Sequence, residues 1–160
     1  MSPKSPPDID VFDIANWFLA KAKSEGKDLK HMKLQKLVYF AYGWYYAYHD
    51  QPLFPETIFA WRHGPVVANL YHQYKHFGKH PIKANVIEMP ELEEPVLSIL
   101  GEVWESYSPC TDLHLSSITH RPRSPWRTVY AGTVWSAEIP PAVIRDYYKT
   151  LINQYENGEN

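Results

Sequence analysis

The histidines are the first residues whose spacing could do chemistry. His72 and His76 are four residues apart, His80 follows after four more, and His63 precedes them. Two histidines at positions i and i+4 of a helix share one face and can bind a metal ion, which would support metal-assisted hydrolysis. A stable zinc site needs a third or fourth fixed ligand, and Gly78 predicts a helix end before His80. A polar helix face explains the same histidines, so we predict no metal site.

The single cysteine offers little basis for nucleophilic chemistry. Cys110 has no flanking catalytic motif and no identifiable histidine partner. Because it is the only cysteine, it excludes an internal disulfide and fits a reducing compartment. The sequence also contains no phosphate-binding glycine loop, nucleotide fingerprint or serine-elbow pattern. We therefore predict no catalytic residue and no cofactor.

A compact group of cationic and aromatic side chains is a stronger candidate for function. The segment from His120 to Arg127 holds three arginines and Trp126, separated by Pro122 and Pro125. Arginine and tryptophan are enriched at protein interfaces, and prolines lower the cost of ordering a loop. One interpretation makes this segment a contact surface. The other places Trp126 in the core and leaves the arginines to solvate the loop.

Further cations are expected to join this segment in space. Arg62 precedes an expected helix start, and Lys33 and Lys36 lie on the least apolar edge of an expected central helix. Together these residues would form one patch suited to an acidic partner surface. The candidate contact residues are Lys33, Lys36, Arg62, His120, Arg123, Trp126 and Arg127. Residues 88–105 carry six glutamates and no basic residue, which is typical of a solvated helix face or, alternatively, of a docking surface.

The elements that position these residues should be helices packed around residues 31–49. This stretch is apolar or aromatic on nearly all sides, so it is expected at the centre of a domain, with Trp44 in the core. Its apolar run is shorter than a membrane-spanning helix requires, and the first residues of the stretch include polar side chains. Gly43 in mid-helix predicts that another backbone crosses closely there.

Caps and breakers predict the remaining elements. A helix is expected from Asp8 or Asp10 to Gly26, and others at about 65–78, 91–106, 112–119 and from Pro140-Pro141 onward. A short two-stranded β element could pair residues 57–62 with 82–88. The prediction is a mainly α fold: one compact domain of about six helices over residues 8–155, with a disordered lead at 1–7 and a frayed tail at 156–160.

Composition narrows the functional classes. The formal net charge is −2, and no basic stripe of the nucleic-acid-binding type is present. Residues 1–83 carry 11 basic against 7 acidic side chains, and residues 84–160 carry 5 against 11. Aromatic residues make up 15% of the chain, which favours an interface in addition to a core. The polar, proline-rich start resembles no signal peptide, so a cytoplasmic location is expected.

Three motifs in order carry a resemblance to a known family. They are residues 33–41 (KLQKLVYFA), residues 60–67 (AWRHGPVV), and His120 with Pro125-Trp126. This pattern resembles the Panacea domain of SocA-like antitoxins, also grouped with phage-associated GepA proteins. The resemblance runs from about Val11 to Tyr148, with His63 where many relatives have tyrosine and His31 where a small hydroxyl residue is common.

The resemblance implies an antitoxin that binds and neutralises a cognate toxin encoded nearby, with no enzymatic activity of its own. It does not imply which toxin, and a homodimer is compatible with it. Two alternatives remain open from the residues themselves: a metal-assisted hydrolase that uses the histidines of the third helix, and a DNA-binding repressor. The low net charge and the missing basic recognition helix weigh against the repressor.

Overall fold

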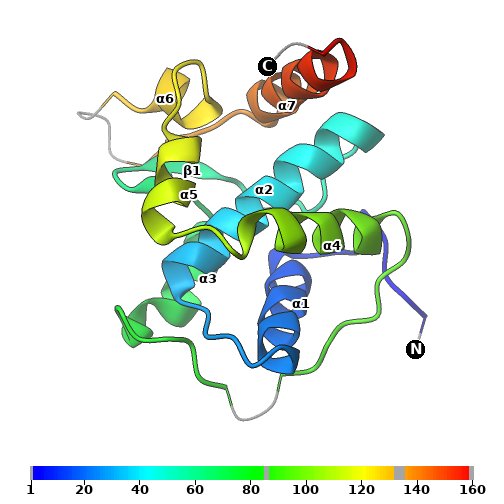
Figure 1. The fold of residues 1–160 in the computed structure, drawn as a ribbon, viewed down its shortest axis with the longest axis vertical. Coiled ribbons are helices and arrows are strands. Elements are labelled where there is room, and N and C mark those ends of the chain that lie inside the picture. The colour runs from blue at the N-terminus through cyan, green and yellow to red at the C-terminus, as the bar shows by residue number, and fades with distance from the viewer. Residues whose placement is uncertain (1, 85–86, 132–135, 159–160) are drawn as a thin grey trace.

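The computed structural model describes residues 2–84, 87–131 and 136–158, which form a mainly α-helical fold (Figure 1). The described helices are α1 (Val11–Ser24), α2 (His31–His49), α3 (Ala68–Tyr74), α4 (Val96–Tyr107), α5 (Asp112–Thr119), α6 (Pro125–Val129) and α7 (Pro141–Glu156). A 3-10 turn, η1 (Lys75–Phe77), extends α3, and the short strands are β1 (Phe59–Trp61), β2 (Gly64–Val66) and β3 (Ala137–Glu138). The predicted fold class is confirmed. Within the described ranges, no helix combines the length and the apolar character needed to cross a membrane.

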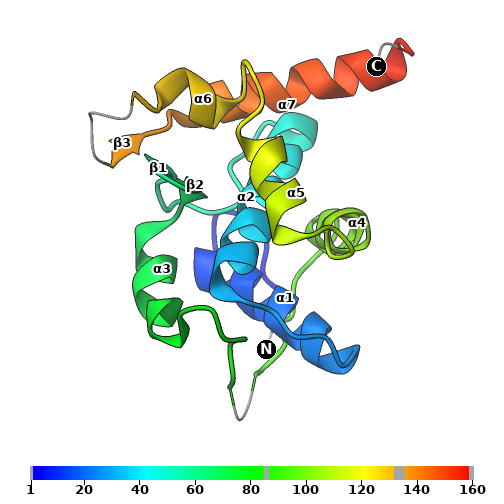
Figure 2. The same ribbon diagram turned by 60° about the vertical axis from the view of Figure 1, so that its left-hand side comes forward.

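Helix α2 runs through the middle of the domain, and α1, α3, α4, α5, α7 and β2 all pack against it (Figures 1 and 2). Its first half is deeply buried, with Leu34, Leu37 and Phe40 fully inaccessible. The second half emerges from the core, since Trp44 is half-buried and Tyr48 is 53% exposed. The expectation of a helix buried on all sides is therefore wrong for its last turns.

Gly43 is a position where α2 makes room for a side chain of α7. A Cβ built on Gly43 would overlap the aromatic ring of Tyr148 from α7. The nearest neighbour of this glycine is thus a side chain of α7, where the sequence predicts a backbone. The physical reason is that α7 presents a flat ring to the groove that Gly43 leaves open in α2.

Local capping signals set several helix ends as predicted. Asp10 caps α1 through a capping box with Asp13, and the Thr111 hydroxyl accepts a hydrogen bond of 3.1 Å from the backbone N of His114 at the start of α5. Pro141 occupies the first turn of α7. Helix α4 begins at Val96, later than the expected residue 91.

The N-terminal residues, which the sequence predicts to be disordered, make specific contacts. Lys4 forms a parallel β-bridge with Leu92. Its backbone N donates a hydrogen bond of 2.8 Å to the carbonyl oxygen of Glu91, and its own carbonyl accepts one of 2.8 Å from Glu93. These contacts tie the start of the chain to the segment before α4.

The small sheet differs from the predicted β element. Strand β1 pairs antiparallel with β2 on one side and with β3 on the other. The described residues of the segment 82–88 do not pair with β1 and form no strand; residues 85–86 lie outside the described residues. The backbone N of Ile82 instead donates a hydrogen bond of 2.8 Å to the carbonyl oxygen of Leu29. That part of the prediction is wrong.

The sequence also misplaces the start of α3. Gly64 and Pro65 belong to β2, and the helix begins at Ala68. Gly64 has a φ of +132°, a conformation that favours glycine and differs from that of a helix cap. Pro65 is tolerated because β2 is an edge strand, where its missing N–H breaks no ladder.

Candidate functional site

Trp126 joins the α5–α6 segment to the β-hairpin. Its Nε1 donates a hydrogen bond of 2.6 Å to the carbonyl oxygen of Trp61, the last residue of β1. Its ring stacks on Tyr130 at 4.5 Å between centroids and meets the His120 ring edge-on at 3.8 Å. Only 5% of the residue is exposed. Trp126 therefore belongs to the core and can influence a partner only by positioning its neighbours.

Helix α6 was predicted as a loop, and Ser124 explains why it forms. The Ser124 hydroxyl accepts a hydrogen bond of 3.2 Å from the backbone N of Arg127 and donates one of 2.8 Å to the carbonyl oxygen of Thr119. Pro125 follows at the first helical position. A serine cap followed by proline is a recognised helix start, so this signal was present in the sequence and was missed.

Arg127 and His120 are bound to the end of α5. The guanidinium of Arg127 donates two hydrogen bonds to the carbonyl oxygen of His120, of 3.1 Å from Nε and 2.9 Å from Nη2. His120 is the C-cap of α5, and its Nδ1 lies 2.5 Å from the carbonyl oxygen of Ser116. A cation at a helix C-terminus complements the negative end of the helix dipole. Both side chains thus have structural roles.

Two loops meet beside these residues, and their arginines are exposed. Arg62 lies in the two-residue turn between β1 and β2, and Arg123, with a φ of +69°, lies between α5 and α6. The loops are in contact, because Nε1 of Trp126 donates its hydrogen bond to the carbonyl oxygen of Trp61. We call residues 61–64 and 120–127 the hairpin–loop surface.

Lys33 and Lys36 lie outside this surface. Lys33 Nζ donates hydrogen bonds of 2.7 and 2.8 Å to the carbonyl oxygens of Ser108 and Cys110, between α4 and α5. Lys36 is 6% exposed; burial lowers the pKa of its ammonium, and Asp112 opposes that shift. The groups that Lys33 and Lys36 interact with lie just before or at the start of α5. His120 lies at the other end of this helix, about 12 Å away along its axis. The expectation of a single patch is wrong for these two lysines.

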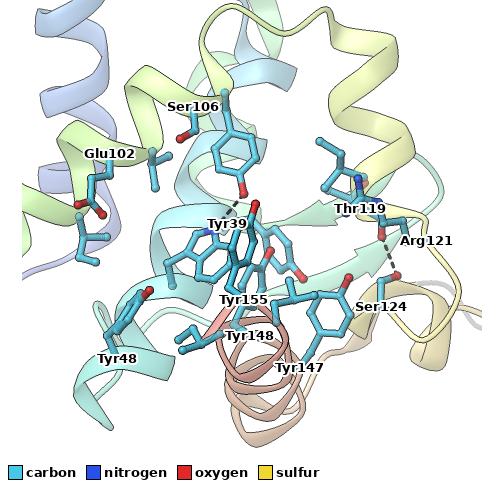
Figure 3. A pocket seen from close by; sticks show the side chains of 17 residues that line it. Tyr39, Tyr48, Glu102, Ser106, Thr119, Arg121, Ser124, Tyr147, Tyr148 and Tyr155 are labelled. Atoms are coloured by element: carbon cyan, nitrogen blue, oxygen red, sulfur yellow. Dashed lines mark hydrogen bonds between the residues drawn. The ribbon is translucent and has the colours of Figure 1, made fainter. Parts of the chain in front are cut away.

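A pocket of about 450 Å³ opens between α2, α4, the end of α5 and α7 (Figure 3). We call it the tyrosine pocket, because its walls include Tyr39, Tyr48, Tyr107, Tyr147, Tyr148 and Tyr155. Figure 3 shows Tyr48 and Glu102 at one end and Arg121, Ser124 and Tyr147 at the other. Seven of the 17 lining residues are aromatic, and the pocket has an acidic end and a basic end.

Four tyrosines of this pocket have raised pKa values and stay protonated at neutral pH. Burial raises the pKa of Tyr39, Tyr107, Tyr147 and Tyr148 above the ordinary tyrosine value, and the interaction between Tyr148 and Tyr39 partly offsets the shift at Tyr39. The guanidinium of Arg121 opposes the rise in the pKa of Tyr147. Neutral phenols can donate hydrogen bonds, so these four side chains line the pocket with neutral hydroxyl groups.

Sequence reasoning did not find the tyrosine pocket. From the sequence, Tyr39 and Tyr48 belong to the aromatic central helix, and Tyr147 and Tyr148 belong to the last expected helix. The available signal was the excess of tyrosine, twelve residues in all. The number of tyrosines does not show where they gather in the fold, because the walls of the pocket come from four separate segments.

The histidines considered for metal binding do not converge. His63 is in the hairpin turn, His72 is on α3, and His76 is on η1. Across the described parts of the chain, no three His, Cys, Asp or Glu side chains are grouped to hold a metal ion. Cys110 is a half-buried free thiol whose Sγ donates to the carbonyl oxygen of Ser106 at 3.6 Å.

Comparisons with known proteins place the sequence motifs in a family. The family model described as "Antitoxin SocA-like, Panacea domain" matches residues 34–127, which include most of α2, the hairpin and α5. The antitoxin SocA of Caulobacter vibrioides (strain NA1000 / CB15N) is 24% identical over 140 residues, covering 81% of this chain and 74% of that protein. No solved structure matches the chain significantly.

Proposed function

Because this chain belongs to the family of SocA-like antitoxins with a Panacea domain, we propose that it is an antitoxin that binds one cognate toxin protein and neutralises it. The observation that carries the proposal is the family match over α2, the hairpin and α5, together with the curated SocA relative. Neutralisation is by direct contact and needs no chemistry from the antitoxin.

We propose the hairpin–loop surface as part of the contact with the toxin. Arg62 and Arg123 are exposed on two different loops. The Trp126–Trp61 hydrogen bond joins the two loops, and the clamp of Arg127 on His120 braces the second of them. Cations on a preorganised surface bind an acidic partner with a small ordering cost. In this arrangement Arg62 and Arg123 touch the toxin, while His120, Trp126 and Arg127 position them.

The first test requires the reading frame next to this gene. Its product, expressed alone in a heterologous host, is expected to stop growth, and co-expression of this chain is expected to restore it. Purified together, the two proteins should elute as one complex. If no neighbouring product is both toxic and bound by this chain, the proposed function is wrong.

The second test addresses the surface. Arg62→Ala and Arg123→Ala should each weaken toxin binding by about tenfold or more while the melting temperature stays unchanged, because both side chains are exposed. Lys79→Ala and Lys83→Ala are matched controls, because they remove exposed cations elsewhere. Trp126→Ala should instead lower the melting temperature strongly, since it removes a buried ring. Equal binding by all four exposed-cation variants would show that the toxin docks elsewhere.

A further inference from the structure

The tyrosine pocket adjoins the hairpin–loop surface and shares Arg121 with it. We infer that this pocket receives an aromatic side chain of the partner protein, flanked in the partner's sequence by an acidic residue. The inference rests on the proposed function, because it takes the partner to be the toxin. It assigns to the pocket the role of a specific anchor point within that interface.

The size and lining of the pocket fit an aromatic ring. A volume of about 450 Å³ lies within the usual range for sites that enclose an organic group. Trp44 and Tyr148 already meet edge-on at 4.8 Å between centroids, and Tyr39 and Tyr148 at 6.0 Å. A further ring that enters the pocket would join these edge-to-face contacts, a geometry that aromatic pairs favour.

The mouth of the pocket favours a protein over a small molecule as its occupant. Tyr48 is 53% exposed and Tyr155 is 79% exposed, and both line the pocket. They are two of the four large exposed hydrophobic side chains among the described residues; the others are Met89 and Leu113. A small ligand inside the pocket would leave both rings in water. A protein surface whose side chain enters the pocket would cover them, and tyrosine is a common anchor at such interfaces.

The opposite charges at the two ends of the pocket determine which way round an inserted segment binds. The guanidinium of Arg121 lies at the end that also holds Tyr147 and Ser124, whereas Glu102 lies at the opposite end (Figure 3). The hydroxyl of Tyr107 accepts a hydrogen bond of 2.9 Å from Nε1 of Trp44, so its own proton is free to be donated. An acidic group beside the inserted ring would therefore face Arg121 and be repelled by Glu102.

The pocket is tested with the toxin by substitution at its exposed rim. Tyr48→Ser, Tyr155→Ser and Arg121→Gln should each weaken binding by at least about tenfold with an unchanged melting temperature. Leu113→Ser is the control for an exposed apolar side chain, because Leu113 is 82% exposed and does not line the pocket. Lys79→Gln is the control for an exposed cation. If the wild-type chain binds the toxin and all three rim variants bind equally well, the inference is overturned while the proposed function stands.

A second measurement does not depend on the toxin. The chain with 13C-labelled tyrosine is titrated with the peptide acetyl-Asp-Trp-Asp-amide and, separately, with acetyl-Lys-Trp-Lys-amide, and the tyrosine ring signals are followed by NMR. The acidic peptide should shift the signals of Tyr48 and Tyr155 saturably, and Arg121→Gln should abolish that shift. The basic peptide should shift them little. If neither peptide moves these signals, or if both move them equally, the inference is wrong whether or not a toxin has been found.

Discussion

The ring of Tyr148 occupies the space that a side chain at Gly43 would need. Helix α7 therefore packs on α2 through one interlocking position, at which the larger residue comes from α7. The same ring forms part of the tyrosine pocket, so the contact between these two helices also shapes one wall of the candidate site.

Gly43→Ala should destabilise the fold by about 1–3 kcal/mol, because the added methyl group must displace a buried ring. The matched control is Gly101→Ala in α4, where a Cβ would meet nothing within 4 Å. That change should leave stability unchanged or raise it by up to about 1 kcal/mol, since alanine favours the helix. Urea unfolding of both variants measures the difference. Equal effects would mean that Tyr148 does not occupy this space in solution.

Trp44→Ala should cost less than the removal of a fully buried side chain from the same helix. Trp44 is half-buried and lines the open tyrosine pocket, so its removal enlarges a space that water can enter. We expect a loss of about 1–3 kcal/mol, including the hydrogen bond to Tyr107. Leu37→Ala, at a fully buried position, should cost about 2–5 kcal/mol. A larger loss from Trp44→Ala in chemical denaturation would contradict this order.

Lys33→Met should lower stability by about 1.5–3 kcal/mol, because hydrogen bonds from its ammonium to the Ser108 and Cys110 carbonyls are lost. Lys30→Met removes an exposed cation from the N-cap of α2, where its side chain makes no capping bond, and should change stability little. Thermal melts compare the two variants. If Lys33→Met leaves the melting temperature unchanged but abolishes toxin binding, Lys33 is a contact residue and not a structural clamp.

Stability should fall at high pH because of the buried tyrosines. Burial raises the pKa of Tyr39 and Tyr148 above the ordinary value of 10.0. The unfolded chain then loses these protons at a lower pH than the folded chain does. Their contribution is complete below about pH 10 and declines as the pH rises further, by up to about 1.4 kcal/mol per pH unit for each tyrosine.

Urea unfolding at a series of pH values from neutral to strongly alkaline measures this decline. Tyr39→Phe removes one of these buried hydroxyls and should make the decline shallower at the same pH values. A stability that stays constant well above pH 10 would mean that these hydroxyls are accessible to solvent.

Several helix boundaries could be predicted from the sequence because their signals are local. The capping box of Asp10 and Asp13, the Thr111 cap and Pro141 each act within one helical turn, so three or four residues contain the information. Ser124-Pro125 is also a local helix-start signal, although the sequence analysis treats this segment as a loop. Local signals of this kind, together with the apolar character of α2, determined the mainly helical fold.

Only the tertiary structure decided how the candidate residues are used. Gly64-Pro65 matches a helix start in isolation, but pairing with Trp61 and Ala60 makes it an edge strand. Burial of Lys36 depends on its neighbours in the folded chain, and the tyrosine pocket depends on walls drawn from α2, α4, α7 and the end of α5. Strand pairing, burial and pockets arise from contacts between segments far apart in the chain, and the spacing of residues within one segment carries no record of those contacts.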